Sequence, residues 1–251
     1  MLREPFSYAQ ASLALPAKRL NGERVVLKIQ YPDRDSEHEA EALARWRGEG
    51  AVRLLDHDQG RHALLLERCE PGVHLSSLDP DDAIDVMIGL LPRSWIPVRG
   101  PFRHLAEESA WLAGELQRDW DGTGRSVDGR LVEAALEAFE RLSGTQGDQV
   151  LVNQDLHADN VVSAAREPWL VIDPKPLVGE REFGVAAIVR GSELGHSREA
   201  VVGRLDRLAG ALALDRERVR LWTLAHTVAW GFQSDGPINE HMETATWLLD
   251  A

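Results

Sequence analysis

The pattern of hydrophobic and polar positions divides the chain into an early part with short apolar runs and a later part with amphipathic stretches. Residues 25–29 are β-branched and apolar around a single Lys28, and the hairpin-turn pair Asn21-Gly22 precedes them. Further short strands are predicted at residues 51–55, 63–67, 150–152 and 169–172. The early part of the chain is therefore expected to be rich in β-structure.

Apolar spacings of three and four residues predict helices in the later part. These are expected over residues 36–47, from residue 79 onward, and over 103–118, 128–142, 197–213, 215–232 and 238–249. Ser36 and Glu39 have the spacing of a capping box, and Asp79-Pro80 has the pattern of an N-cap followed by proline at the first helical position. Strands early and helices late predict an α+β fold with segregated layers.

The composition indicates an ordinary globular protein. The chain has 251 residues, of which 43% are hydrophobic, enough for one large or two modest domains. No apolar run reaches the 18 or more residues of a membrane span, and the first six residues lack the apolar core of a signal peptide. The single cysteine, Cys69, excludes an internal disulfide framework. We expect a cytoplasmic protein without a membrane partner.

The net charge suggests which partners suit the surface. Lys and Arg number 28 against 41 Asp and Glu, which gives a formal charge of −13. Such a surface repels nucleic-acid phosphate and attracts cations, so we expect no nucleic-acid partner and consider a small cationic substrate. Simple solubility explains the same charge without any ligand.

The polar segment between the last two predicted strands carries candidate chemistry. Asp155 is followed five residues later by Asn160, and Asp173 comes directly after the second apolar run. Carboxylates at the ends of apolar runs are costly to bury unless they bind a cation or share a proton. The spacing fits the D-x-x-x-x-N loop of kinases, where Asp is the base and Asn binds magnesium. We therefore expect a site on a hairpin formed by the two apolar runs, with oxygen ligands suited to Mg²⁺.

Simpler interpretations of this segment stay open. Asp and Asn are usual turn residues, so the spacing by itself is common. His157 lies beside Asp155 and Asp159, but a lone histidine next to a carboxylate is more often a structural hydrogen-bonding residue. No second histidine stands at ligand spacing, so a zinc site is not expected.

Two stretches carry a resemblance to a known family. Residues 153–160 read NQDLHADN and residues 169–179 read WLVIDPKPLVG. They resemble the aminoglycoside phosphotransferases, most closely the aminoglycoside/hydroxyurea antibiotic-resistance kinases, over about residues 25–232. The resemblance implies a two-lobed protein-kinase-like fold, with a small β-rich N-lobe over residues 1–69 and a larger helical C-lobe over residues 70–251.

The resemblance also implies roles for single residues. Asp155 would be the catalytic base, and Asn160 and Asp173 would hold Mg²⁺. Lys28 would position the nucleotide phosphates and would be held by Glu39, for which Glu41 is the alternative and helix capping the competing role.

Two further segments would contact the nucleotide. Residues 67–72 would form the hinge beside the adenine ring, with Glu67 and Cys69 at the nucleotide, although Cys69 has the simpler role of a small half-buried apolar residue. The phosphate loop would lie at about residues 6–15, which contain no glycine.

The chain departs from the family pattern at two places. Asn153-Gln154 stands where the family has His-Gly, and Gly184 stands where an Asp is common. Segment 180–182 would form part of an acidic stretch beside the active-site mouth. Candidates for contacting substrate amines are Asp235, Glu240 and Glu243, for each of which a solvated surface role is the simpler alternative.

The expected function is transfer of the γ-phosphate of ATP or GTP to a hydroxyl of an aminoglycoside-like antibiotic. One alternative is a kinase of a metabolite such as an amino sugar or amino alcohol. Another is a catalytically silent nucleotide-binding protein, which the glycine-free loop and Asn153-Gln154 favour. The sequence does not decide the acceptor hydroxyl, the nucleotide or the oligomeric state.

Overall fold

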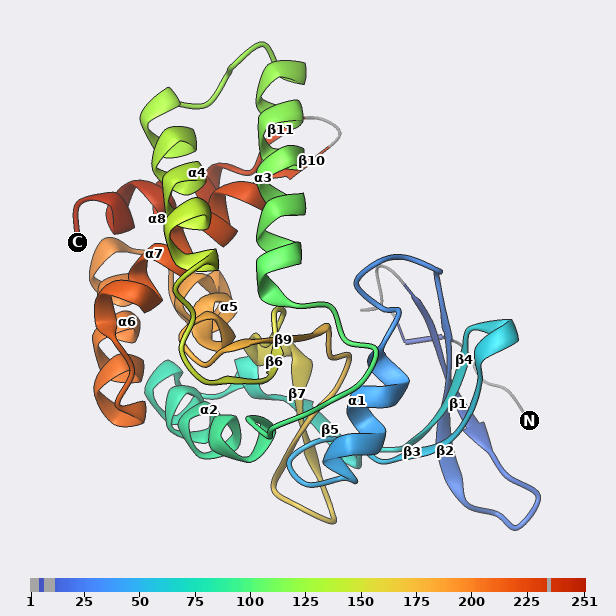
Figure 1. Ribbon diagram of the computed structural model, residues 1–251. Coiled ribbons are helices and arrows are strands. Elements are labelled where there is room, and N and C mark those ends of the chain that lie inside the picture. Colours follow the sequence, from blue (N-terminus) through green and yellow to red (C-terminus); the bar gives the residue numbers. More distant parts are fainter. Residues whose placement is uncertain (1–4, 7–11, 234–235) are drawn as a thin grey trace. The chain divides into compact units, whose positions relative to one another are not determined.

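The computed structural model describes residues 5–6, 12–233 and 236–251 of the chain (Figure 1). The chain forms two compact units. The first contains the residues up to Ser77 together with Asp159–Pro176, and the second contains Leu78–Ala158 and Leu177–Ala251.

The first unit contains a four-stranded antiparallel sheet, drawn in blue to cyan in Figure 1. Its strands, in sheet order, are β1 (Ser12–Lys18), β2 (Arg24–Gln30), β4 (Ala63–Glu67) and β3 (Leu54–Asp58). Lys18 pairs with Arg24, and the loop between them contains Gly22 at φ +91°, a backbone conformation that favours glycine. The Asn21-Gly22 signal thus predicted this hairpin correctly.

Helix α1 (Glu39–Trp46) begins three residues later than expected. His38 is its N-cap residue, and the Ser36 N–H donates to Asp33 Oδ1 at 2.7 Å instead of opening the helix. The expected capping box is therefore wrong, because the Glu39 carboxylate lies in the interior of the unit. Leu43 and Trp46 on the same helix are buried, in agreement with the predicted apolar stripe.

A three-stranded sheet completes the first unit, in the order β5 (Pro71–His74), β7 (Val161–Ala164), β8 (Trp169–Val171). The expected hairpin between the apolar runs 150–152 and 169–172 is wrong. β8 pairs with β7, in the register Val161 to Val171, and β6 (Gln149–Asn153) pairs instead with β9 (Pro176–Glu180) in the second unit. β7 is only four residues long, Val-Val-Ser-Ala, so its pattern is too short to predict from periodicity.

The compact units divide the chain differently from the expected lobe boundary between residues 69 and 70. Segment 159–176 belongs to the first unit because its strands continue the pairing of β5. The Val171 N–H donates to the Gly50 carbonyl at 2.9 Å, and the Val171 carbonyl accepts from the Val52 N–H at 3.0 Å. These contacts join segment 159–176 to the early part of the chain.

The second unit is mainly helical. Its helices are α2 (Pro80–Ser94), α3 (Leu105–Gly122), α4 (Gly129–Ser143), α5 (Ala186–Arg190), α6 (Arg198–Leu212), α7 (Arg216–Ala229) and α8 (Asn239–Leu249). The short strands β10 (Phe232–Gln233) and β11 (Gly236–Pro237) and the 3₁₀ turns η4 (Phe183–Val185) and η5 (Ser192–Leu194) also belong to it. Helix α7 contacts α3, α4, α5, α6 and α8 and is almost entirely buried from Trp222 to Ala229. The predicted late helices are confirmed, whereas the five-residue α5 was missed.

No helix in the described part of the chain is both long enough and apolar enough to cross a membrane.

Candidate active site

A buried lysine between two carboxylates forms the centre of the candidate site in the first unit. β2 places Lys28, the first residue of α1 is Glu39, and Asp173 follows β8. Lys28 Nζ lies 2.6 Å from Glu39 Oε2 and 2.5 Å from Asp173 Oδ1. Glu39 also accepts a hydrogen bond of 2.8 Å from Gln30 Nε2. Glu39, and not the alternative Glu41, is therefore the partner of Lys28.

Electrostatics keeps the Lys28 side chain charged. Lys28 is 5% exposed and Glu39 is fully buried. Burial alone lowers the pKa of Lys28, but the neighbouring carboxylates of Glu39 and Asp173 outweigh it and raise that pKa above its ordinary value. A permanently charged ammonium held in this way is suited to binding phosphate oxygens.

Asn160 and Asp173 lie at the same end of the β7–β8 ladder. Val161 pairs with Val171, and the Ile172 N–H donates to the Asn160 carbonyl at 2.8 Å. Asp173 has φ +50°, a region that Asp adopts more readily than most residues, and its side chain is 45% exposed. The ladder thus places the backbone of Asn160 opposite Ile172, the residue before Asp173.

These two residues suit a magnesium ion that also binds phosphate. In the described part of the chain, no group of three or more His, Cys, Asp and Glu side chains could hold a metal ion. Mg²⁺ commonly uses one or two carboxylates and takes its other ligands from phosphates and water. Asp173 with Asn160 fits this limited donor set, and a fully protein-built metal cage does not.

The expected hinge residue Glu67 is held by an arginine that the sequence did not reveal. Arg166 Nε lies 2.9 Å from Glu67 Oε1, and Arg166 Nη2 lies 2.9 Å from Glu67 Oε2. The Glu67 carboxylate also accepts from the Arg53 N–H at 3.1 Å. The side chain of Glu67 is thus held by contacts within the first unit. Contact between the nucleotide and the backbone of Glu67 remains a prediction.

Cys69 should be chemically inert. Burial, together with the negative charge of Glu67, raises the pKa of its thiol to about 12, although Arg166 acts in the opposite direction. The thiolate fraction at pH 8 is then roughly a thousandfold below that of an ordinary cysteine. We expect iodoacetamide to alkylate Cys69 about a thousandfold more slowly in the native protein than in urea, measured by mass spectrometry. A native rate within tenfold of the unfolded rate would contradict this environment.

The expected base, Asp155, belongs to the second unit and follows β6. Its backbone N–H donates to Asn153 Oδ1 at 3.1 Å, so the residue that replaces the family histidine shapes the start of the loop. Asp155 Oδ1 lies 3.8 Å from Arg190 Nη2 and 4.0 Å from His157 Nε2. The Asp155 side chain is 15% exposed. The carboxylate is thus largely buried beside a cation.

Sequence reasoning missed Arg190, the last residue of α5. Its guanidinium is buried, hydrogen-bonds with His226 Nδ1 and lies over the Trp230 ring, with Arg190 Cζ 4.9 Å from the ring centroid. Burial lowers the pKa of Arg190, while the charges of Asp155 and Glu193 raise it. The helical pattern around residues 186–190 is too short to have marked this arginine as a site residue.

His241 on α8 should make stability depend on pH. Burial, with a further contribution from the charge of Arg190, lowers its pKa to about 4, although the Trp230 and Thr227 carbonyls act in the opposite direction. The unfolded chain therefore binds one proton more between pH 6.5 and 4, so this contribution is complete above pH 6.5 and is lost as pH falls through 4. We expect urea unfolding to show a loss of roughly 2–3 kcal/mol over this range that His241→Gln reduces. The control, His57→Gln at an exposed position, should leave the slope unchanged, and an equal slope in His241→Gln would contradict the assignment.

Gly184, in place of the family Asp, lies in a tight position at η4. A Cβ atom there would lie 3.0 Å from Trp95 Nε1 and 3.3 Å from Val152 Cγ1. The space that a carboxylate would need is filled by these two side chains. Glycine at this position therefore fits the surrounding packing, whereas the Asp that is common in the family would not.

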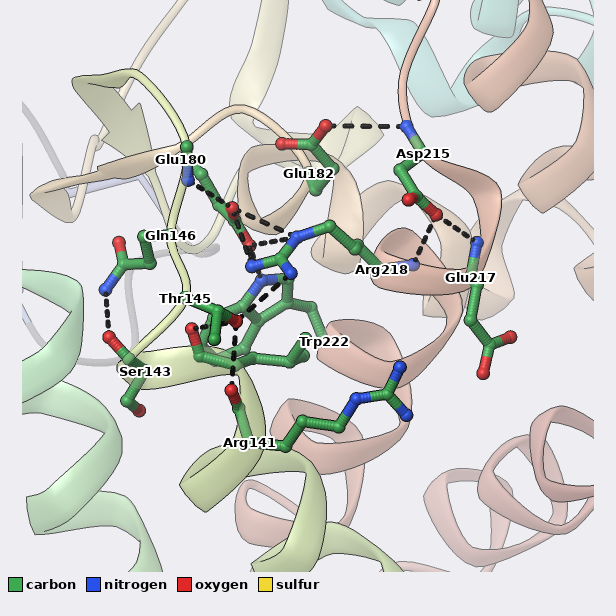
Figure 2. Close-up of polar contacts among 12 residues, drawn as sticks. Arg141, Ser143, Thr145, Gln146, Glu180, Glu182, Asp215, Glu217, Arg218 and Trp222 are labelled. Atoms are coloured by element: carbon green, nitrogen blue, oxygen red, sulfur yellow. Dashed lines mark hydrogen bonds and ion pairs between the residues drawn. The ribbon is translucent and has the colours of Figure 1, made fainter.

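The acidic segment 180–182 is not a free acidic surface. Glu180 is 1% exposed, and Figure 2 shows its carboxylate surrounded by Arg218, Trp222 and the loop before β6. Glu182 accepts a hydrogen bond of 3.4 Å from the Asp215 N–H. The charge of Glu180 is thus already compensated inside the second unit.

The remaining expected contacts are placed as follows. Glu243 Oε2 lies 2.8 Å from His196 Nε2, and Glu240 is exposed in the first turn of α8. Asp235 and residues 7–11 of the expected phosphate loop lie outside the described residues. Substrate contacts by the acidic residues stay predictions.

Solved structures define the class of protein to which this fold belongs. Choline kinase LicA from Streptococcus pneumoniae aligns with a TM-score of 0.66 at 12% identity, covering 100% of this chain and 94% of that one. Aminoglycoside phosphotransferase APH(4)-Ia aligns with a TM-score of 0.61 at 18% identity, covering 100% and 90%. The fold is therefore protein-kinase-like, as predicted from the sequence.

The family follows from sequence comparison. Residues 4–236 match the aminoglycoside/hydroxyurea antibiotic resistance kinase family, and the chain belongs to it. The hydroxyurea phosphotransferase of Kitasatospora aureofaciens is 40% identical over 89% of this chain and 66% of its own length. The streptomycin 6-kinase of Streptomyces griseus is 39% identical over 86% of this chain and 72% of its own length. The chain thus spans about two thirds of the first relative's length, and the predicted family is confirmed.

Proposed function

We propose that this protein transfers the γ-phosphate of ATP or GTP to a hydroxyl group of an aminoglycoside-like antibiotic. The observation that carries the proposal is the buried Lys28 between Glu39 and Asp173, with the backbone of Asn160 bonded to Ile172, the residue before Asp173. The Lys28 cation suits the phosphates of a nucleoside triphosphate, and the amide and the partly exposed carboxylate suit its metal ion. The relatives named as a hydroxyurea phosphotransferase and streptomycin 6-kinases support the same class of reaction.

The reaction assigns each of these residues one task. The acceptor oxygen attacks the γ-phosphorus, the bond from that phosphorus to the oxygen bridging it to the β-phosphate breaks, and a nucleoside diphosphate leaves. Asp155 orients the acceptor hydroxyl and takes its proton. Lys28 positions the phosphates. Asn160 and Asp173 would hold Mg²⁺, which when bound offsets the negative charge of the phosphate oxygens. Positioning and electrostatics therefore supply most of the rate.

The charge of the protein favours a cationic acceptor. The net charge of −13 would steer an aminoglycoside toward the surface, and this attraction weakens with salt. Hydroxyurea carries no such charge, so salt dependence separates the two acceptor classes. An amino sugar or amino alcohol is the metabolite alternative.

The test is nucleoside-diphosphate release from Mg-ATP and Mg-GTP against a panel of acceptors. The panel contains streptomycin, other aminoglycosides, hydroxyurea, amino sugars and amino alcohols, each at low and high salt. We expect release with one aminoglycoside that falls as salt increases. If only hydroxyurea or only an amino alcohol gives release, the acceptor is that compound class and not an aminoglycoside.

Nucleotide binding is measured separately so that a silent panel is informative. Thermal stabilisation by nucleotide with Mg²⁺ should approach roughly 2.7 kcal/mol at about 100 times the Kd. Stabilisation without release would leave a nucleotide-binding protein whose acceptor is outside the panel. The absence of both would favour the catalytically silent alternative.

A further inference from the structure

We propose that Arg190 is a positioning residue that sets the orientation of Asp155, a role that rests on the proposed function. Arg190 ends α5 and is buried, and its Nη2 lies 3.8 Å from Asp155 Oδ1. A separation of 3.8 Å is too long for a hydrogen bond, so the guanidinium acts on the carboxylate through its charge. It can therefore hold Asp155 in place without donating a hydrogen bond to it.

The surroundings of Arg190 fix the guanidinium independently of Asp155. Its Nη1 hydrogen-bonds with His226 Nδ1, and its Cζ lies 4.9 Å from the centroid of the Trp230 ring. Arginine has donors only, so His226 Nδ1 must accept, and this assigns the neutral His226 tautomer that carries its proton on Nε2. His226 lies in the last turn of α7 and Trp230 follows that helix, where the helix dipole favours a cation. An aromatic face adds a further attraction.

Glu193, three residues after Arg190, contacts the far end of the stretch that begins at Asp155. Glu193 Oε1 accepts a hydrogen bond of 2.9 Å from the Ala158 N–H. Segment 190–193 thus contacts both Asp155 and Ala158, the two ends of a four-residue stretch. Both contacts lie within the second unit, so its core determines the position of the base.

The contacts of Arg190 differ from those of an ordinary structural ion pair. Arg218 and Glu180 in the same unit meet through four hydrogen bonds of 2.7–3.2 Å, which satisfy both groups directly. Arg190 instead uses a histidine and an aromatic ring, and approaches the Asp155 carboxylate without such bonding. A purely structural pair would gain from closing that distance.

The test compares Arg190→Met and Arg190→Lys with a matched control. Arg204→Met removes another buried arginine, which donates only to the backbone carbonyls of Val189, Leu194 and Gly195 in the hydrogen bonds described for it. We expect Arg190→Met to lower kcat roughly 10–100-fold with the nucleotide KM unchanged, since small misplacements at a reacting group cost about this much. Arg190→Lys should recover part of the loss, because it keeps a cation. Arg204→Met should lower the melting temperature but leave kcat within about threefold.

Hydrogen exchange supplies a readout that does not need an acceptor. Peptides covering residues 153–160 should exchange faster in Arg190→Met than in wild type or Arg204→Met, at temperatures well below each melting point. If Arg190→Met does not fold, Arg190→Lys against wild type makes the same comparison, with an intermediate kcat and intermediate exchange expected.

Three results would overturn the assignment: unchanged kcat in a folded Arg190→Met, an equal loss of kcat in Arg204→Met, or unchanged exchange over residues 153–160. If wild type transfers no phosphate to any acceptor, the proposed function fails. The exchange comparison then still decides whether Arg190 positions Asp155.

Discussion

Replacing Asp155 with alanine is expected to lower kcat by roughly 10²–10⁴-fold, the usual contribution of a general base. The carboxylate is 15% exposed, and alanine removes the group assigned to accept the proton of the acceptor hydroxyl. The melting temperature of Asp155→Ala is measured in parallel, because the variant removes a carboxylate 3.8 Å from the buried Arg190 guanidinium. The measurement is nucleoside-diphosphate release with the acceptor found in the panel.

Asp159 provides a matched control for Asp155. It lies four residues later in the same stretch and is exposed, with its carboxylate bound to the Ser76 hydroxyl. Asp159→Asn keeps the shape of that side chain and should leave kcat within about threefold of wild type. Retention of most activity by Asp155→Ala, or an equal loss in Asp159→Asn, would remove Asp155 from the role of base. Nucleotide-induced stabilisation, measured in parallel, shows whether either variant has lost binding instead.

Replacing Glu180 with glutamine is expected to destabilise the second unit by roughly 3 kcal/mol. Glu180 lies at the end of β9, and both of its oxygens accept from Arg218 at 2.7–3.2 Å. The Trp222 indole N–H donates to the same carboxylate (Figure 2). The Gly147 N–H also donates to it at 3.1 Å. Removing one partner of a buried ion pair leaves the other charge uncompensated, which costs roughly 3–5 kcal/mol. The low end applies because Arg218 keeps 22% exposure.

Glu217 on α7 is the control for this prediction. It pairs with Arg220 three residues later and its side chain is 48% exposed, so Glu217→Gln should cost less than about 1 kcal/mol. Urea unfolding followed by tryptophan fluorescence measures both variants. A loss below about 1 kcal/mol for Glu180→Gln would show that the Glu180 cluster contributes little net stability. Both variants should retain kcat if Glu180 is structural, as its burial indicates.

The sequence by itself determined the local elements and the family. Helix periodicity located α3, α4 and α6–α8, and the Asn21-Gly22 turn located the β1–β2 hairpin, because these signals depend only on neighbouring residues. The stretches at 153–160 and 169–179 were long enough to identify the family. They also marked Asp155, Asn160 and Asp173 as candidates before any distances were known.

Only the tertiary structure decided which distant residues meet. Strand pairing joined β8 to β7 and β6 to β9, against the expected hairpin, since pairing depends on contacts that no local pattern encodes. It also selected Glu39 over the alternative Glu41 as the partner of Lys28, and it placed Glu180 in the interior of the second unit. Arg190 could be recognised as a neighbour of Asp155 only from the structure, because the two residues are 35 positions apart in the chain. A buried charge needs a compensating partner, and that partner can lie far away in the sequence. The spacing of residues along the chain therefore does not identify it.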